Sequence, residues 1–279
     1  MTTTATGRLI GVSLGPGDPG WITRRAWEVL TGPAHWAYPI SAPGQASYAL
    51  EIVERAGLAL PADHSALLFP MTHDTATLAS AWARAATTVG DRLSAGEDVA
   101  FLVEGDASTY ATFSHLSRTV QANLPTVAVE TIPGVTSFNA AAARLGWPLA
   151  QTHERFAVLP AGYDIATVER LLPALDTLVL LKVKPLLAEL VELLQRSGLE
   201  GQCAFVERAG TQHERIVTDL AQLRTLKPHY LSLLLIRNRQ HHQQHQHQHQ
   251  RTTDLGSGND QGQGQGQGKA QGQNRGSVG

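Results

Sequence analysis

The chain has 279 residues, of which 42% are hydrophobic, so it is long enough for one large domain or two small ones. Its 22 basic and 24 acidic side chains nearly balance, which argues against the basic surface of a nucleic-acid-binding protein. The one cysteine, Cys203, excludes a disulfide framework and a cysteine-based metal site, and its strand-like surroundings predict a buried core thiol. We see neither a secretory signal nor an apolar run of membrane-spanning length, so we expect a soluble, cytoplasmic protein.

Short apolar runs alternate with segments of helical periodicity from Arg8 onward. The run 98–103 is almost continuously apolar, which is typical of a strand in a sheet covered on both faces. In the first half we expect strands and helices in alternation over residues 8–14, 21–30, 35–39, 46–56, 67–70, 75–94, 98–103 and 112–122. This alternation predicts a mostly parallel α/β sheet.

A second series of elements begins near Pro125. Starting with a strand, we expect elements over residues 127–132, 136–145, 155–160, 165–172, 177–183, 185–196, 203–207, 215–218 and 230–236. The last three are strands in close succession, which indicates antiparallel pairing. The predicted fold class is therefore α/β with two domains, residues 1–124 and 125–239, and an active-site cleft between them.

The composition changes abruptly after Arg239. Residues 240–279 are rich in His and Gln, then in Gly and Gln, and have almost no apolar side chains, so we expect a disordered tail. Loose binding of a transition-metal ion by its histidines is a minor hypothesis, which concerns His241, His242, His245, His247 and His249.

Glycine-bearing turns follow four of the predicted strands. They span Gly11–Gly20, Glu104–Tyr110, Pro133–Ser137 and Glu207–Thr211. Glycine lets the backbone approach a ligand closely, and the start of a helix presents free N–H groups. Because ligands of open α/β sheets bind beyond the carboxyl ends of the strands, we expect the four turns to converge on one cleft.

The chain has no Gly-x-Ser-x-Gly or His-Glu-x-x-His pattern, so it offers no recognisable nucleophile elbow or zinc site. We expect His73–Asp74 and His153–Glu154 on the surface or at helix caps. Asp18 and Asp106 suit hydrogen bonding to a ligand as well as capping of the following helix. Lys182 ends a strand and either forms an ion pair at the cleft or extends into solvent.

Together these motifs resemble the tetrapyrrole methylase family, whose members use S-adenosylmethionine to methylate precursors of cobalamin and sirohaem. The matching segments follow the family's order and are Gly15–Pro19, Glu104–Asp106, Pro133–Ser137, Glu207–Gly210 and Glu214–Val217. The chain most resembles the branch that methylates C20 of precorrin-2, through Ala37–Pro39, Phe69–Met71, Val99–Asp106, Leu180–Val183 and Tyr230–Leu233. It departs from the family pattern at Ala107, where proline is usual, and in the tail after Arg239, which has no family counterpart.

The resemblance implies that S-adenosylmethionine is held between the two domains. It assigns cofactor binding to Pro16, Glu104, Gly105, Asp106, Thr109, Thr136, Ser137, Lys182, Ala209 and Gly210. It assigns binding of the tetrapyrrole, precorrin-2 or cobalt-precorrin-2, to Gly15, Gly17, Asp18 and Pro19. Arg24, Arg25 and Lys182 are candidates for binding its carboxylates. Asp18 and Tyr110 are candidate catalytic residues that would move a proton.

The resemblance also implies a homodimer. The charge balance, the short apolar runs and the lack of a metal-binding pattern lead us to expect no nucleic acid, no membrane and no metal site. Two alternatives remain open. One is methylation at another ring position, as on uroporphyrinogen III or a later precorrin, although the uroporphyrinogen branch tends to carry aspartate where this chain has Pro39. The other is a non-enzymatic metal-binding role of the histidine-rich tail.

Overall fold

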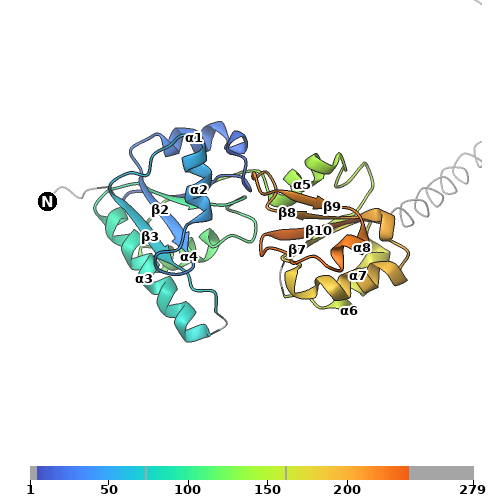
Figure 1. The fold of residues 1–279 in the computed structure, drawn as a ribbon. Coiled ribbons are helices and arrows are strands. Elements are labelled where there is room, and N and C mark those ends of the chain that lie inside the picture. The colour runs from blue at the N-terminus through green and yellow to red at the C-terminus, as the bar shows by residue number, and fades with distance from the viewer. Residues whose placement is uncertain (1–4, 73, 161, 239–279) are drawn as a thin grey trace, which may run out of the picture. The chain divides into compact units, whose positions relative to one another are not determined.

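The computed structural model describes residues 5–72, 74–160 and 162–238. Residues Met1–Asn238 form one compact unit, in which two five-stranded sheets are each covered by helices (Figure 1). The predicted α/β fold class is therefore confirmed. The predicted tail 240–279, with its five histidines, and His73 lie outside the described residues.

The first sheet has the strand order β3-β2-β4-β1-β5, and all of its pairs are parallel. Its strands are β1 (Leu9–Ser13), β2 (His35–Ile40), β3 (His64–Leu68), β4 (Val99–Val103) and β5 (Val129–Ile132). β3 begins earlier than the predicted segment 67–70, because its polar start pairs with β2. β5 pairs with β1, so the first sheet continues past residue 124, where we expected the second domain to begin. The domain boundary itself stays a prediction.

Helices cover both faces of the first sheet (Figure 1). They are α1 (Arg24–Leu30) and α2 (Tyr48–Arg55) on one face, and α3 (Thr75–Ser94) and α4 (Phe113–Asn123) on the other. In β4, Phe101 packs with α3 and α4, whereas Leu102 packs with α1 and α2. Both side chains are fully buried, which explains why this strand is apolar throughout.

The first helix starts later than its pattern indicates. Pro19–Trp21 form a short 3-10 turn, and α1 begins only at Arg24, after Thr23. The Thr23 hydroxyl accepts a hydrogen bond from the Ala26 N–H at 3.2 Å and so caps the helix. The predicted start at residue 21 was wrong, because Trp21 belongs to the 3-10 turn and the Thr23 cap starts the helix at Arg24.

The second sheet has the strand order β6-β7-β10-β8-β9. Its strands are β6 (Phe156–Leu159), β7 (Thr177–Leu181), β8 (Cys203–Glu207), β9 (Arg215–Val217) and β10 (Ser232–Arg237). β6 and β7 are parallel, and the other pairs are antiparallel. The antiparallel pairing expected for the last three strands is confirmed, and β10 also pairs with β7 at the centre of the sheet.

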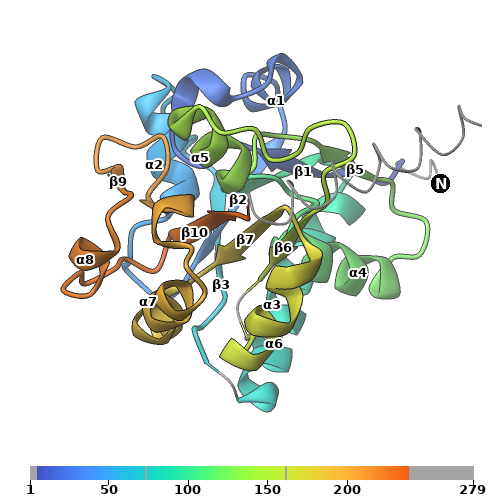
Figure 2. The same ribbon diagram turned by 90° about the vertical axis from the view of Figure 1, so that its right-hand side faces the viewer.

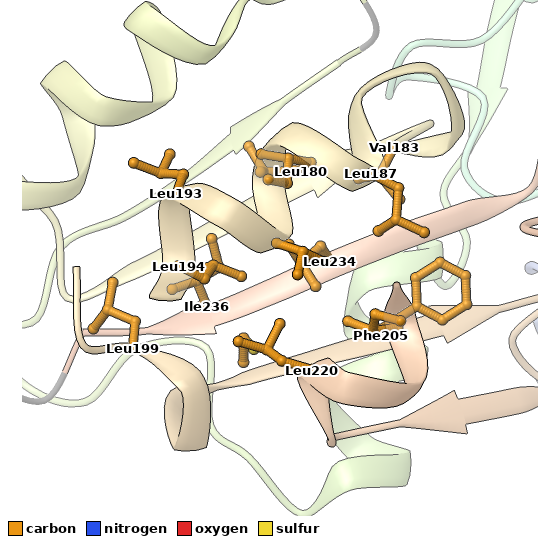
Figure 3. Packing of buried hydrophobic residues seen from close by; sticks show 14 of the residues in the cluster. Leu180, Val183, Leu187, Leu193, Leu194, Leu199, Phe205, Leu220, Leu234 and Ile236 are labelled. Atoms are coloured by element: carbon orange, nitrogen blue, oxygen red, sulfur yellow. The ribbon is translucent and has the colours of Figure 1, made fainter. Parts of the chain in front are cut away.

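In the described part of the chain, four helices accompany the second sheet (Figure 2). α5 (Ser137–Leu145) covers one face, and α6 (Ile165–Leu171), α7 (Leu187–Arg196) and the short α8 (Leu220–Leu223) cover the other. Figure 3 shows the second of these layers, where Leu180, Phe205 and Leu234 from three strands meet Leu187 and Leu194 of α7. Burying each such side chain contributes about 1.5–3 kcal/mol.

Cys203 belongs to this buried cluster. Burial raises the pKa of its thiol to about 11, so the expectation of an unreactive core cysteine is confirmed. Across the described ranges, no helix combines the length and apolar character needed to cross a bilayer.

Candidate functional site

The turns after β1 and β4 are joined by a backbone bridge. The Gly15 N–H donates to the Gly105 carbonyl at 3.1 Å, and the Gly105 N–H donates to the Gly15 carbonyl at 2.8 Å. Both glycines have φ of 75°, in the left-handed region that glycine adopts without a side-chain clash. β1 and β4 are neighbours whose following helices, α1 and α4, cover opposite faces. This is the switch point of a doubly wound sheet, where ligands bind.

Ser13 joins the third turn to the first two. Its hydroxyl donates to the Ile132 carbonyl at 2.5 Å and accepts from the Ala107 N–H at 2.8 Å. A Cβ atom on Gly134 would overlap Ser13 and lie 3.0 Å from the Gly105 carbonyl oxygen. Only glycine therefore lets the third turn approach this closely.

Asp106 organises the same turns through its carboxylate. It accepts hydrogen bonds from the Gly134 N–H at 2.8 Å, the Ser108 N–H at 3.0 Å and the Thr109 hydroxyl at 3.0 Å. Burial alone would raise the pKa of Asp106, but hydrogen bonds from Ser108, Gly134 and Thr109 outweigh it and lower the pKa. The ionised Asp106 side chain therefore links the turn after β4 to the turn after β5.

The fourth turn packs against the first. A Cβ atom on Gly17 would lie 2.5 Å from Thr211 Cγ2, and one on Gly210 would overlap the Trp21 ring. Gly210 also has φ of 79°, which disfavours any other residue. The expected convergence of the four glycine turns is thus confirmed.

A cavity of about 430 Å³ opens beside these turns, a size typical of small-molecule sites. Its wall includes residues that follow strands of both sheets, such as Glu104 after β4 and Lys182 after β7. The predicted site residues that line it are Pro16, Glu104, Thr109, Tyr110, Ser137, Lys182 and Ala209. The predicted residues absent from its wall are Gly15, Gly17, Asp18, Pro19, Gly105, Asp106, Thr136 and Gly210.

Several of the residues outside the wall shape helix ends. The Asp18 carboxylate accepts from the Gly20 N–H at 2.8 Å, and the Thr136 hydroxyl accepts from the Asn139 N–H at 3.2 Å at the start of α5. Asp74 likewise caps α3, which agrees with the capping role expected of it as one of two alternatives. Caps fix the direction in which each turn enters its helix.

The basic candidates on α1 are engaged by carboxylates and do not line the cavity. Arg24 pairs with Glu28 at 3.3 Å, and Arg25 pairs with Glu130 at 2.9 Å.

The side chain of Glu154, which we expected on the surface or at a helix cap, is almost fully buried and forms an ion pair with Arg237 at 2.9 Å.

Backbone strain is concentrated in the cavity wall. Among the described residues, four other than glycine have positive φ, and three of them line the cavity: Tyr110 (51°), Lys182 (54°) and Arg208 (49°). Each such conformation costs on the order of 1–3 kcal/mol and persists only where surrounding structure enforces it. Strain of this kind is typical of a functional site.

Unpaired polar atoms are concentrated there too. Within the described ranges, four buried side-chain atoms have no hydrogen-bond partner, and three belong to residues of the wall: Ser47 Oγ, Arg208 Nε and Ser232 Oγ. A buried donor or acceptor left unpaired is unfavourable by about 1–3 kcal/mol. The cavity therefore offers hydrogen bonds that suit a polar ligand.

Charged groups complete the wall. The Lys182 ammonium lies 5.3 Å from the centroid of the Tyr230 ring. Burial raises the pKa of Glu104 to about 7, with Lys182 lowering it and Glu51 raising it. Burial likewise raises the pKa of Tyr48 to about 12, so its hydroxyl stays protonated. The cavity thus holds one carboxyl group that is partly protonated at neutral pH, beside two cations, Lys182 and Arg208.

The family model for tetrapyrrole (corrin/porphyrin) methylases matches residues 8–224. The chain belongs to this family. Among curated proteins, this tetrapyrrole methylase is 32% identical to a precorrin-2 C(20)-methyltransferase from a Sinorhizobium species, over 85% of this chain and 97% of that protein. It is also 32% identical to the cobalt-precorrin-2 C(20)-methyltransferase of Salmonella typhimurium, over 84% of this chain and 97% of that protein.

A longer relative is the cobalamin biosynthesis protein CobIJ of Mycobacterium bovis, 33% identical over 83% of this chain. The chain spans about half of that protein, since the match covers 46% of its length. Two solved structures share the fold of this methylase. They are a cobalt precorrin-4 methyltransferase, CbiF (TM-score 0.62, 22% identity, 82% of this chain and 94% of the other), and a Thermus thermophilus uroporphyrin-III C-methyltransferase complexed with S-adenosyl homocysteine (TM-score 0.57, 23% identity, 82% and 97%).

Sequence reasoning left several wall residues of this methylase unassigned: Ser47, Tyr48, Met71, Arg208, Tyr230 and Ser232. Arg208 adjoins Ala209 in the fourth motif, and Tyr230 begins a segment shared with the C20 branch, so both had a signal. Ser47 and Tyr48 at the start of α2 had none, because only the packing of α2 beside β4 brings them to the cavity.

In the part of the chain that the structure describes, no cluster of three or more His, Cys, Asp or Glu suits a metal ion.

Proposed function

We propose that the chain is an S-adenosylmethionine-dependent methyltransferase that methylates C20 of precorrin-2 or cobalt-precorrin-2 in cobalamin biosynthesis. The identity to two proteins of that name, over 97% of the length of each, is the observation that carries this proposal. The cavity supports it independently, because its wall contains seven of the residues that the family resemblance assigns to the site.

The cavity wall suits S-adenosylmethionine. Lys182 and Arg208 provide cations for its carboxylate, and the Arg208 Nε–H is a buried donor with no partner in the described residues. The unpaired hydroxyls of Ser47 and Ser232, with that of Ser137, suit the ribose hydroxyls and the adenine nitrogens. When bound, this group supplies an electrophilic methyl on a sulfonium sulfur.

The open side of the cavity suits a flat, apolar macrocycle. Three of its wall residues are large, apolar and solvent-exposed: Met71 (69%), Tyr110 (55%) and Tyr230 (40%). Exposed apolar groups of this kind mark binding surfaces. Lys182, beside the Tyr230 ring, is placed to pair with a carboxylate of the substrate. The Gly15–Pro19 turn stays our prediction for the substrate side.

The residues of this chain act by aligning the two reactants and by excluding water from them. C20 belongs to an electron-rich conjugated system and is itself the nucleophile, so no strong base is needed to activate it. Holding two reactants in line contributes up to roughly 7–11 kcal/mol to lowering the barrier. The rigid frame for that alignment is provided by the four glycine turns. Ser13 and Asp106 link the first three through hydrogen bonds, and close packing attaches the fourth to the first.

The test is incubation of the purified protein with methyl-labelled S-adenosylmethionine and precorrin-2, with and without cobalt, followed by mass and NMR analysis. One added methyl at C20 supports the proposal, and the effect of cobalt identifies the form of the substrate. A methyl at another ring position supports the first alternative. Absence of cofactor binding contradicts the methyltransferase proposal.

A homodimer and a cytoplasmic location also remain proposals. The first rests on the family resemblance, and the second on the sequence, in which we found neither a secretory signal nor an apolar run of membrane-spanning length. Light scattering on the purified chain measures the first, and fractionation of cells measures the second. The metal-binding alternative predicts tight binding of cobalt or nickel that disappears when residues 240–279 are deleted, without any methyl transfer.

A further inference from the structure

We propose that the side chain of Glu104 accepts the proton that leaves C20 during methyl transfer. This inference rests on the proposed function. The methyl group replaces a hydrogen, so one proton is released for each methyl transferred. The bond from sulfur to the methyl carbon breaks as the bond from C20 to that carbon forms. The C20–H bond then breaks, its electron pair returns to the conjugated system, and the proton moves to a Glu104 carboxylate oxygen.

The backbone holds Glu104 at the switch point of the first sheet. On one side, the Val103 carbonyl accepts from the Leu14 N–H at 2.9 Å, which continues the ladder between β1 and β4. On the other side, Gly105 is bridged to Gly15 through two hydrogen bonds. The residue between these two attachments therefore has a fixed position in the cavity wall.

Of the described residues that line the cavity, Glu104 is the only carboxylic acid. Within the described ranges, its carboxyl group makes no hydrogen bond or ion pair that would occupy it. The earlier candidates are occupied elsewhere, since Asp18 accepts from the Gly20 N–H outside the wall and the Tyr110 hydroxyl donates to the Val158 carbonyl at 3.1 Å. A free carboxyl in a ligand cavity is the group best placed to take a proton.

Burial is the main reason that the pKa of this carboxyl is raised. Lys182 follows β7 and lowers its pKa, whereas Glu51 on α2 raises it, and burial is the largest influence. Two further groups face the same region. Tyr48 on α2 interacts electrostatically with Glu104, and Arg208 after β8 interacts electrostatically with Tyr48. A pKa of about 7 leaves about half of the side chains ionised at neutral pH, which is the optimum for a general base.

The experiment compares the wild-type 279-residue chain with Glu104→Gln and with the matched control Glu51→Gln. Glu51 is a neighbouring carboxylate that does not line the cavity. We expect Glu104→Gln to lower kcat about 100-fold or more, because general-base catalysis contributes factors of this size. Binding of S-adenosylmethionine, measured by calorimetry, should stay within about twofold of wild type, since a neutral amide of similar shape replaces a half-buried group that makes no ion pair.

Two readouts separate proton transfer from a structural role. With precorrin-2 deuterated at C20, the isotope effect on kcat should increase in Glu104→Gln, because removal of the proton becomes slower. The pH profile of kcat should rise through the pKa of Glu104 in wild type and lose that rise in the variant. In Glu51→Gln the plateau should be kept and the rise should move to lower pH, because a negative charge that raises the pKa is gone.

A third readout needs no substrate. In unliganded protein labelled with ¹³C at the glutamate carboxyl carbons, one resonance that is absent from Glu104→Gln should titrate near pH 7. It should titrate at lower pH in Glu51→Gln. A midpoint near the ordinary value of 4.5 would overturn the inference, as would a Glu104→Gln enzyme with wild-type kcat or with a loss confined to cofactor binding. Wild-type protein that binds S-adenosylmethionine but leaves precorrin-2 unmethylated overturns the proposed function, and it does so without reference to the variant.

Discussion

At the residue scale, burial decides the chemical state of the groups around the cavity. The Glu104 carboxyl and the Tyr48 hydroxyl both have raised pKa values, chiefly because folding removes them from water. Arg208 Nε is buried without a partner in the described residues, and the Arg208 backbone has positive φ. These features are unfavourable for folding, which is characteristic of residues kept for ligand binding or catalysis.

Replacing Glu104 should stabilise the protein at alkaline pH. The pKa of this carboxyl is about 7 in the folded state, against an ordinary value of 4.5, so folding becomes less favourable as the pH rises through this interval. The loss amounts to up to about 3 kcal/mol. Glu104→Gln should therefore raise the free energy of unfolding in urea more at pH 8 than at pH 5. Equal changes at both pH values would show that the Glu104 carboxyl does not titrate in this interval.

Arg208→Met should weaken the binding of S-adenosylmethionine about 10–100-fold and leave the melting temperature nearly unchanged. The variant removes a buried N–H that has no partner in the described residues, so folding loses no hydrogen bond at that atom. Arg215→Met is the matched control, because its guanidinium pairs with the buried Glu207 at 3.0 Å. The control should lower stability and spare cofactor binding. Calorimetry measures cofactor binding, and thermal unfolding measures stability. An Arg208→Met variant that binds S-adenosylmethionine normally but melts at a lower temperature would refute the assignment of Arg208.

At the element scale, the site depends on turns that fit against one another. Each turn follows a strand whose apolar pattern is local, but its shape depends on partners from other elements. Ser13 on β1 bonds the end of β5 and the turn after β4, and Gly210 after β8 lies against Trp21. Small residues at these points are therefore required by close approach.

Gly210→Ala should be more destabilising than Gly57→Ala. Both glycines have positive φ, 79° and 84°, so alanine carries a similar backbone penalty of roughly 1–2 kcal/mol at each. A Cβ atom on Gly210 would overlap the Trp21 ring, whereas one on Gly57 meets nothing within 4 Å. The overlap should add about 1–3 kcal/mol of destabilisation. Urea unfolding measures the difference, and equal losses would show that the turns are not closely fitted.

At the scale of the whole molecule, the described residues contain the buried hydrophobic clusters on which the fold depends. The buried clusters extend from Leu9 to Ile236, and the family match covers residues 8–224. β10 is the last strand in the described chain, yet it lies at the centre of the second sheet between β7 and β8. The end of this strand is therefore the point beyond which deletion should become tolerable.

Deletion of residues 240–279 should leave the melting temperature and methyl transfer unchanged, because the buried core of the described residues, from Leu9 to Ile236, is kept. Deletion of residues 230–279 should prevent folding, because it removes β10 and its fully buried Leu234 and Leu235. Circular dichroism and the methyl-transfer assay measure both variants. Loss of activity in the shorter deletion, without loss of structure, would assign a role to the tail.

The local sequence determined the elements and the turns between them. Apolar runs such as 98–103, helical periodicity such as 75–94, and the glycine turns depend on neighbouring residues alone, so they were predicted with nearly correct bounds. The order of the motifs also identified the family. Close pairing of the last three strands followed from their short spacing.

Only the tertiary structure decided how these elements act together. The pairing of β5 with β1 and the place of Ser47 and Tyr48 at the cavity depend on contacts between segments distant in sequence. The same is true of the pKa of Glu104, since burial, Lys182 and Glu51 act on it from three parts of the fold. Burial and long-range electrostatics exist only once the chain has folded, which is why sequence identified Glu104 through its motif but not the chemistry of its side chain.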